Sequence, residues 1–330
     1  MKDFVKIAQD RIRGAILGTA IGDALGMPAE GLKPESIQKY YGKIKGFRSP
    51  NPKRRRIHDL KRGQWTDDTQ LMLAIGESII ECGGINYENI MQRHVEAFSE
   101  RRGWGKATTN SVQRYISGAQ WNDSGMIDAA GNGPPMKIAP IGVLYGMDII
   151  DHFELVTVVV NISRMTHRDA RATVSAILQA KLVSSGIKYG LGGVKNLLEH
   201  LHADSILLEN ALSGLEIAKE PLSSKIYDAL ALARMGASDE KIREEIGAGP
   251  FVNQSYAFMC ALMYKYIDDP ETCLEEIINQ GGDCDTTGAM AGSIIGAACG
   301  YSIFPYRWKR CLEDKKRLIT LADKLWKRTI

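Results

Sequence analysis

Two stretches of this 330-residue chain place a glycine at every fourth position, and this spacing constrains the fold more than any other feature. The glycines are Gly14, Gly18, Gly22 and Gly26 in the first stretch, and Gly288, Gly292, Gly296 and Gly300 in the second. A glycine inside a helix costs about 0.5–1 kcal/mol relative to alanine, unless something packs closely against the bare backbone. The four-residue spacing keeps the glycines near one helix face, as in helix pairs that approach closely. We therefore expect two central helices, which would carry Asp23 and the acids Asp283 and Asp285 into the middle of the molecule.

The rest of the chain has the pattern of an all-α protein. Apolar residues recur at three- and four-residue spacing in several segments, which indicates amphipathic helices. These segments are Thr69–Cys82, Tyr87–Arg101, Asp169–Ser185, Ser223–Arg234, Asp239–Ile246 and Leu274–Gln280. The segment His152–Val160 is rich in β-branched residues and could form a strand, but no partner run lies near it and hairpin signals are few. No low-complexity linker divides the chain, so we predict one all-α domain over residues 1–330, with little or no sheet.

The segment Thr286–Pro305 carries no charge and is long enough to raise the question of a membrane span. It is rich in glycine, alanine and serine, and two acids stand just before it. A buried core helix is the better interpretation, and we expect no membrane partner.

Composition excludes several other classes of protein. A formal net charge of +3 is too small to indicate nucleic acid, and we expect the basic run Lys53–Arg56 to be a solvated loop. The segment Met1–Phe4 lacks the apolar core of a secretory signal. The six cysteines form no C-x-x-C pair and no zinc spacing, so we expect reduced thiols in a cytoplasmic protein.

Two short acidic clusters stand near opposite ends of the chain. Thr66, Asp67 and Asp68 form one, and Asp283, Asp285 and Thr286 form the other after a pair of glycines. Both could simply cap helices, because threonine is a good N-cap and acids favour the first turn. Carboxylate and hydroxyl oxygens are also the ligands that Mg²⁺ and Mn²⁺ prefer. Four carboxylates brought together would repel one another, so a fold that unites the clusters favours bound metal, two divalent cations by our interpretation.

Other catalytic motifs are absent from the sequence. No G-x-x-x-x-G-K-[ST] or G-x-S-x-G occurs, and Gly190–Gly193 lacks the third glycine of a dinucleotide-binding turn. Asp67 and Asp68 are not followed by the third acid of a D-D-x-x-D motif. His167 precedes a predicted helix and could be a capping or surface histidine.

An ordered set of motifs resembles the ADP-ribosylglycohydrolase family along most of the chain. The motifs are Gly22-Asp23-Ala24-Leu25-Gly26 with Glu30 after it, Trp65-Thr66-Asp67-Asp68-Thr69, Gly131-Asn132-Gly133 with Met136 and Pro140, Thr166-His167, and Gly282-Asp283-Cys284-Asp285-Thr286. The resemblance implies a compact multi-helix orthogonal bundle with a dinuclear Mg²⁺ or Mn²⁺ site.

The resemblance also assigns expected roles to residues. Thr66, Asp67, Asp68, Asp283, Asp285 and Thr286 match metal ligands. Glu30 matches a carboxylate near the scissile bond, and the candidates for the general base are Glu30, Asp67 and Asp68. Positions matched to the ADP-ribose cleft are Gly131, Asn132, Gly133 and His167, with Gly105 of Gly103-Trp104-Gly105 as a looser match.

Two residues depart from the family pattern. Cys284 replaces the usual threonine between the acids, and it should point away from metal if Asp283 and Asp285 point toward it. Lys137 stands where arginine often follows Met136, which keeps the positive charge but loses the planar guanidinium.

The function implied is hydrolysis of the glycosidic bond between ADP-ribose and an acceptor, either a protein side chain or a small molecule. Two alternatives remain open. One is a non-catalytic ADP-ribose-binding protein of the same fold, and the other is a hydrolase of another small nucleotide-sugar N-glycoside. All the matched acids are present, which favours an enzyme.

Overall fold

The computed structural model describes residues 2–50, 59–212 and 220–328. The basic run Lys53–Arg56, expected to be a solvated loop, lies outside the described residues.

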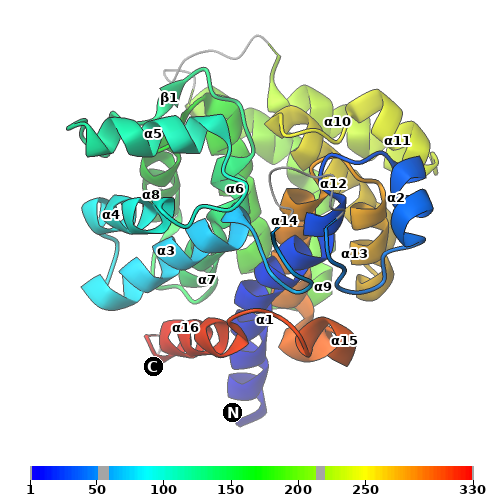
Figure 1. The fold of residues 1–330 in the computed structure, drawn as a ribbon, viewed down its shortest axis with the longest axis horizontal. Coiled ribbons are helices and arrows are strands. Elements are labelled where there is room, and N and C mark those ends of the chain that lie inside the picture. Colours follow the sequence, from blue (N-terminus) through cyan, green and yellow to red (C-terminus); the bar gives the residue numbers. More distant parts are fainter. Residues whose placement is uncertain (1, 51–58, 213–219, 329–330) are drawn as a thin grey trace.

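The two glycine-stepped segments form α1 (Lys2–Gly26) and α14 (Cys284–Cys299), which lie antiparallel at the centre of the molecule (Figure 1). Their backbones touch at each step. A Cβ atom added to Gly22 would lie 1.8 Å from the carbonyl oxygen of Gly288, and one added to Gly14 would lie 2.0 Å from that of Gly296. The expectation of two interior glycine-faced helices is confirmed, since both are buried along this contact.

The remaining helices surround this pair. Along the chain they are α2 (Pro34–Tyr41), α3 (Asp67–Cys82), α4 (Tyr87–Phe98), α5 (Lys106–Ile116), α6 (Gly133–Lys137), α7 (Ala139–Gly146), α8 (His152–Arg164), α9 (Ala170–Ala211), α10 (Leu222–Arg234), α11 (Asp239–Ile246), α12 (Val252–Tyr266), α13 (Pro270–Asn279), α15 (Tyr306–Lys309) and α16 (Lys315–Lys327), with short 3₁₀ turns η1 (Met27–Ala29) and η2 (Tyr301–Ile303). Figure 1 shows α3, α4, α5 and α8 to one side of the central pair, α11, α12 and α13 to the other, and α15 and α16 at the end where both termini lie.

Strand structure is minimal within the described part of the chain. Strands β1 (Met126–Ile127) and β2 (His167–Arg168) pair in parallel, and one isolated bridge joins Gly131 to Phe251. The all-α prediction is confirmed.

The suggestion of a strand at His152–Val160 is wrong, because this segment belongs to α8. Asp151 and Glu154 form a capping box at its start, and Leu155, Val158, Val159 and Ile162 place their apolar side chains in the core at helical spacing. Valines are compatible with a helix when their side chains pack in the core, so the β-branched composition of this segment was misleading.

Two helix boundaries also differ from expectation. The helix expected over Asp169–Ser185 continues as α9 to Ala211, with a bend at Gly190, where φ is 66°. The second glycine helix ends at Cys299, because Gly300 has a φ of 84° and caps it. The helical part of the uncharged run therefore ends before Gly300. The turn η2 has no buried residue, and Phe304 after it returns to the core.

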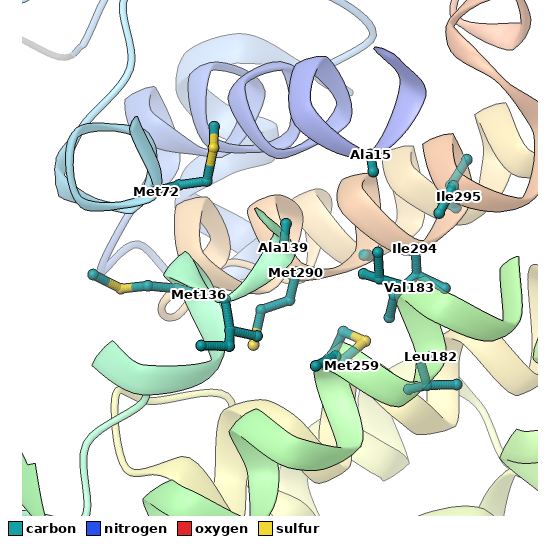
Figure 2. Packing of buried hydrophobic residues seen from close by; sticks show 14 of the residues in the cluster. Ala15, Met72, Met136, Ala139, Leu182, Val183, Met259, Met290, Ile294 and Ile295 are labelled. Carbon is teal, nitrogen blue, oxygen red and sulfur yellow. The ribbon is translucent and has the colours of Figure 1, made fainter. Parts of the chain in front are cut away.

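The apolar core surrounds α14. Figure 2 shows Ile294 of α14 beside Val183 of α9, with Met136 of α6 and Met290 of α14 in the same cluster. The buried apolar residues of the surrounding helices form one continuous cluster with these. Among the described residues, no helix is both long and apolar enough to cross a bilayer.

Candidate metal and active site

A cavity of about 620 Å³ opens where the end of α1 meets the starts of α3 and α14. The loop before α6, the loop before α12 and His167 of β2 complete its wall. Most of the residues that the sequence assigned to a site line it, namely Glu30, Asp67, Gly105, Gly131, Asn132, Gly133, His167, Asp283, Asp285 and Thr286. Thr66 and Asp68 do not line the cavity. They are buried next to Asp23 and the other acids.

Both acidic clusters lie at helix starts beside the cavity. The side chains at the two N-cap positions do not cap their helices. Thr66 and Asp283 occupy the N-cap positions of α3 and α14, and neither side chain bonds to its own helix backbone. The side chains are therefore left for other partners. Gly281 and Gly282 have φ values of 67° and 70°, a conformation that turns the chain into α14 and that glycine adopts without strain.

Asp23 joins α1 to the first cluster. Its buried carboxylate accepts hydrogen bonds from the backbone N–H of Thr66 at 2.9 Å and from that of Thr69 at 3.1 Å. The hydroxyls of Thr66 and Thr69 approach it to 2.8 and 2.6 Å. The start of α3 is thus fixed on the glycine helix by one acid. Asp23 was not predicted as a site residue, although a single charge within an otherwise apolar stretch of α1 is a signal that could have identified it.

The carboxylates lie close enough to change one another's ionisation. Burial raises the pKa of Asp23 to about 6, although its four hydrogen-bond donors oppose the shift. Burial and then the charge of Asp23 raise the pKa values of Asp67 and Asp68 well above the ordinary range. Burial and then the charge of Glu30 do the same for the pKa of Asp285. Close, buried acids of this kind are unfavourable when ionised without a compensating cation.

The donor atoms fit a hard divalent cation. One carboxylate oxygen from each of Glu30, Asp283 and Asp285 lies within 4.8 Å of the others. The Oδ1 atom of Asp68 is buried and has no hydrogen-bond partner in the described chain, while its Oδ2 lies 3.1 Å from the hydroxyl of Thr66. A buried carboxylate oxygen without a partner is rare unless an ion or water completes it. An all-oxygen set suits Mg²⁺ or Mn²⁺ better than zinc.

The pKa shifts predict opposite pH trends for the metal-free and metal-bound protein. Free aspartate has a pKa of about 3.9, so the raised values mean that the folded protein binds these protons more tightly than the unfolded chain. This contribution to stability is fully present below about pH 4. It is lost as the pH rises through the folded pKa values, which are about 6 for Asp23 and raised well above the ordinary range for Asp67. Cations bind the ionised form, so their stabilisation should grow over the same range.

We therefore expect the increase in melting temperature caused by saturating Mg²⁺ or Mn²⁺, measured against EDTA at the same pH, to be larger at pH 8 than at pH 5. At a cation concentration of about 100 times Kd the stabilisation should reach about 2.7 kcal/mol. Comparison at fixed pH removes the titration of all other groups. An equal increase at both pH values would show that the cation does not bind these acids.

The glycine loop Gly131–Gly133 packs on His167 and reaches the second acidic cluster. A Cβ atom on Gly133 would lie 2.5 Å from Cε1 of His167, so only glycine fits against the ring without displacing it. The side-chain amide of Asn132 donates to Oδ2 of Asp283 at 2.7 Å. Asn132, predicted to bind substrate, therefore also holds a metal-ligand candidate in place.

His167 is neither a capping nor a surface residue. It is 4% exposed, and burial followed by the charge of Lys137 lowers its pKa to about 3, so the imidazole is neutral. Asp169, two residues later, caps α9 instead.

The two departures from the family pattern are both buried. The thiol of Cys284 faces the carbonyl oxygen of Gly26 at 3.4 Å, away from the acids as expected. Lys137 is fully buried, which was not anticipated, and its ammonium group donates to the hydroxyl of Thr166 at 3.1 Å. Phe251, whose ring stacks on Arg171, also lines the cavity, and nothing in the sequence pattern pointed to it.

The chain is similar to known proteins over nearly its whole length. Residues 5–330 match the sequence profile of the ADP-ribosylglycohydrolase family. An uncharacterised protein of Archaeoglobus fulgidus is 31% identical, over 96% of each chain. The ADP-ribosyl-(dinitrogen reductase) glycohydrolase of Rhodospirillum rubrum is 26% identical, over 93% of this chain and 91% of the relative. A solved structure titled as an ADP-ribosylglycohydrolase-related protein complex superposes with a TM-score of 0.72 at 27% identity, covering 98% of this chain and 100% of its own.

The family profile and the Rhodospirillum rubrum relative both define a class of glycohydrolases. This chain belongs to the ADP-ribosylglycohydrolase family, and it is an enzyme of that class.

Proposed function

We propose that this enzyme hydrolyses the glycosidic bond between ADP-ribose and an acceptor, and that it requires two divalent cations, Mg²⁺ or Mn²⁺. The observation that carries the proposal is the convergence of Glu30, Asp67, Asp283 and Asp285 on one cavity wall, with Asp23 and Asp68 behind it. A carboxylate-rich cleft of this kind suits the positive charge that develops at an anomeric carbon. ADP-ribosylated protein or an ADP-ribose-containing small molecule would be the substrate, in line with the name of the Rhodospirillum rubrum relative.

The positions of the residues indicate different roles for them. The cations would be held by Thr66, Asp67, Asp68, Asp283, Asp285 and Thr286, and when bound they would supply Lewis-acid charge that polarises a hydroxyl or water oxygen. A carboxylate accepts a proton from the attacking water as its oxygen bonds to the anomeric carbon and the bond to the acceptor breaks. The acceptor atom takes up a proton as it leaves, so the two products together contain the OH and the H of one water molecule and the carboxylate is regenerated. Of the three candidate bases, Glu30 and Asp67 line the cavity and Asp68 does not, which favours the first two.

The remaining walls suit the rest of the ligand. The backbone N–H of Asn132 donates to the carbonyl oxygen of Pro250 at 3.2 Å, so within this loop the N–H groups of Gly131 and Gly133 are the ones suited to a diphosphate. The Nε2 edge of His167 is suited to it as well. Gly105 precedes α5 on another part of the cavity wall. Cytoplasmic location and a single domain over residues 1–330 remain predictions from the sequence.

The test is to incubate the protein with arginine-, serine- and acetyl-linked ADP-ribose, with Mg²⁺, with Mn²⁺ and with EDTA, and to measure released ADP-ribose. We expect release from at least one substrate, abolished by EDTA and restored by cation. Binding of ADP-ribose without release from any substrate would favour the non-catalytic alternative. Release only from other nucleotide-sugar N-glycosides would favour the alternative of a hydrolase of such compounds.

Replacing Asp285 with asparagine should weaken cation binding and activity together. Asparagine keeps the shape but removes a charge that faces Glu30, Asp283 and Asp68. Loss of an outer-shell partner of a metal typically costs about 10–100-fold in affinity, and a direct ligand should cost no less. Titration calorimetry with Mn²⁺ measures this, with the exposed Asp228→Asn as the matched control. Unchanged cation stoichiometry and affinity in Asp285→Asn would remove Asp285 from the ligand set.

A further inference from the structure

Lys137 at the end of α6 is a charged side chain with no exposure to solvent, close to the cleft but not on its wall. Its ammonium group makes one hydrogen bond within the described chain, to Oγ1 of Thr166 at 3.1 Å. Burying a charge is costly, and a buried lysine with a single neutral partner adds little to stability. The contacts of Lys137 therefore indicate a role in arranging the residues of the cleft.

The hydroxyl of Thr166 links Lys137 to His167. An ammonium group only donates, so Oγ1 of Thr166 is the acceptor in that bond. Oγ1 also lies 2.9 Å from Nδ1 of His167. These are the only two side-chain partners of Thr166 in the described residues, so the single hydroxyl hydrogen has one acceptor available, which is Nδ1. Burial lowers the pKa of the Lys137 amine to about 7, and the charge of Asp67 partly opposes this shift.

This hydrogen assignment fixes the state of the imidazole. Nδ1 carries a lone pair, and a neutral ring must then carry its hydrogen on Nε2. The low pKa of His167, about 3, keeps the ring neutral through the physiological range. His167 lines the cavity, and its Nε2 makes no hydrogen bond to a described residue. A Cβ atom at Gly131 would lie 3.0 Å from Nε2, so the glycine also leaves this edge of the ring open.

We propose that Lys137 is a positioning residue that acts through Thr166 to hold His167 as the Nε2–H tautomer, which donates a hydrogen bond to an oxygen of the ligand in the cleft. The identity of that ligand as ADP-ribose rests on the proposed function, whereas the tautomer does not. The alternative tautomer, with hydrogen on Nδ1, would present a lone pair to the cleft and would repel an anionic oxygen.

The tautomer can be measured in the free protein by ¹⁵N NMR of the histidine side chains, with His167→Phe to assign the signals. We expect Nδ1 of His167 to be unprotonated and Nε2 protonated from pH 5.5 to 7. Lys137→Met removes the donor to Thr166 and should give a mixture of tautomers, while Lys137→Arg should restore the wild-type signal. A protonated Nδ1 in the wild type, or an unchanged tautomer in Lys137→Met, would overturn the proposal.

A second pair of variants serves if Lys137→Met does not fold. Thr166→Ser keeps the hydroxyl group and should keep the Nε2–H tautomer of His167. Thr166→Val removes the hydroxyl group and should give a mixture of tautomers. Equal tautomer populations in these two variants would again overturn the proposal.

Binding of ADP-ribose, measured by calorimetry, tests the consequence in the cleft. His167→Phe should weaken binding roughly 10–100-fold, the value of one hydrogen bond to a charged acceptor. Lys137→Met should weaken binding less, by the fraction of the protein that loses the Nε2–H tautomer. Lys137→Arg should bind within a few-fold of wild type. Full affinity in His167→Phe would overturn the role in binding. Absence of ADP-ribose binding by the wild type would instead count against the proposed function, and the NMR result would stand apart from it.

Discussion

Replacing Gly22 with alanine is expected to cost at least about 3 kcal/mol of the free energy of unfolding, the upper part of the range for an overpacked core. The added methyl group would lie 1.8 Å from the carbonyl oxygen of Gly288 and 2.8 Å from the next backbone nitrogen. These are backbone atoms of a buried helix and cannot rotate away, so α1 and α14 must separate. Because whole proteins are stable by only about 5–15 kcal/mol, one methyl group would remove a large fraction of the total.

Gly192→Ala is the matched control for this experiment. Gly192 also lies inside a helix, α9, but it is exposed and nothing lies within 4 Å of a Cβ atom built there. Alanine is the better helix former by about 0.5–1 kcal/mol, so this variant should be slightly more stable than wild type. Urea unfolding of both variants gives the difference. Similar stability for Gly22→Ala and Gly192→Ala would mean that the close contact of α1 and α14 does not exist.

The same contact explains why so much of the fold could be predicted from sequence. Glycine at four-residue spacing is costly without a close partner, so the pattern itself required two packed helices. The partner of Gly26, however, is the backbone of Cys284 and not another glycine. Gly300 continues the spacing in the sequence but ends the helix, because spacing alone does not reveal a positive φ.

Candidate site residues that belong to local sequence motifs could be predicted, whereas contacts that depend on packing could not. Paired acids next to threonines identified both clusters, and the structure brings them together. The attachment of the first cluster to α1 through Asp23 depends on a long-range contact between α1 and the start of α3, which no local pattern encodes. Burial of Lys137 depends in the same way on the elements that cover α6. The β-branched run at the start of α8 misled because strand propensity reflects a packing environment as much as a residue type.

For Glu30, the structure suggests a second role beside the one expected from the sequence. Glu30 ends η1 with φ and ψ of −46° and 129°, directly after the glycine helix, and lines the cavity. By sequence, Glu30 matched a carboxylate near the scissile bond and was not among the expected metal ligands. Its carboxylate nevertheless lies within 4.8 Å of those of Asp283 and Asp285, close enough to share a cation with them. The two roles, proton transfer and coordination, make different predictions for one variant.

Glu30→Gln keeps the size and hydrogen-bonding capacity of the side chain but removes its charge and basicity. If Glu30 accepts the proton of the attacking water, turnover should fall by about 10²–10⁴-fold, the range for a positioned acid–base group. Mn²⁺ affinity and ADP-ribose affinity should change far less, because Asp67, Asp283 and Asp285 would still hold cations and the Gly131–Gly133 loop would still contact the ligand.

Single-turnover release of ADP-ribose and calorimetry with Mn²⁺ separate these quantities, with Glu35→Gln as the control. Glu35 is an exposed glutamate in the first turn of α2, five positions along the chain, and its variant should behave as wild type in both assays. A parallel loss of Mn²⁺ affinity and turnover in Glu30→Gln would make Glu30 a metal ligand. Wild-type turnover would exclude Glu30 from proton transfer and leave Asp67, the other candidate on the cavity wall, as the base.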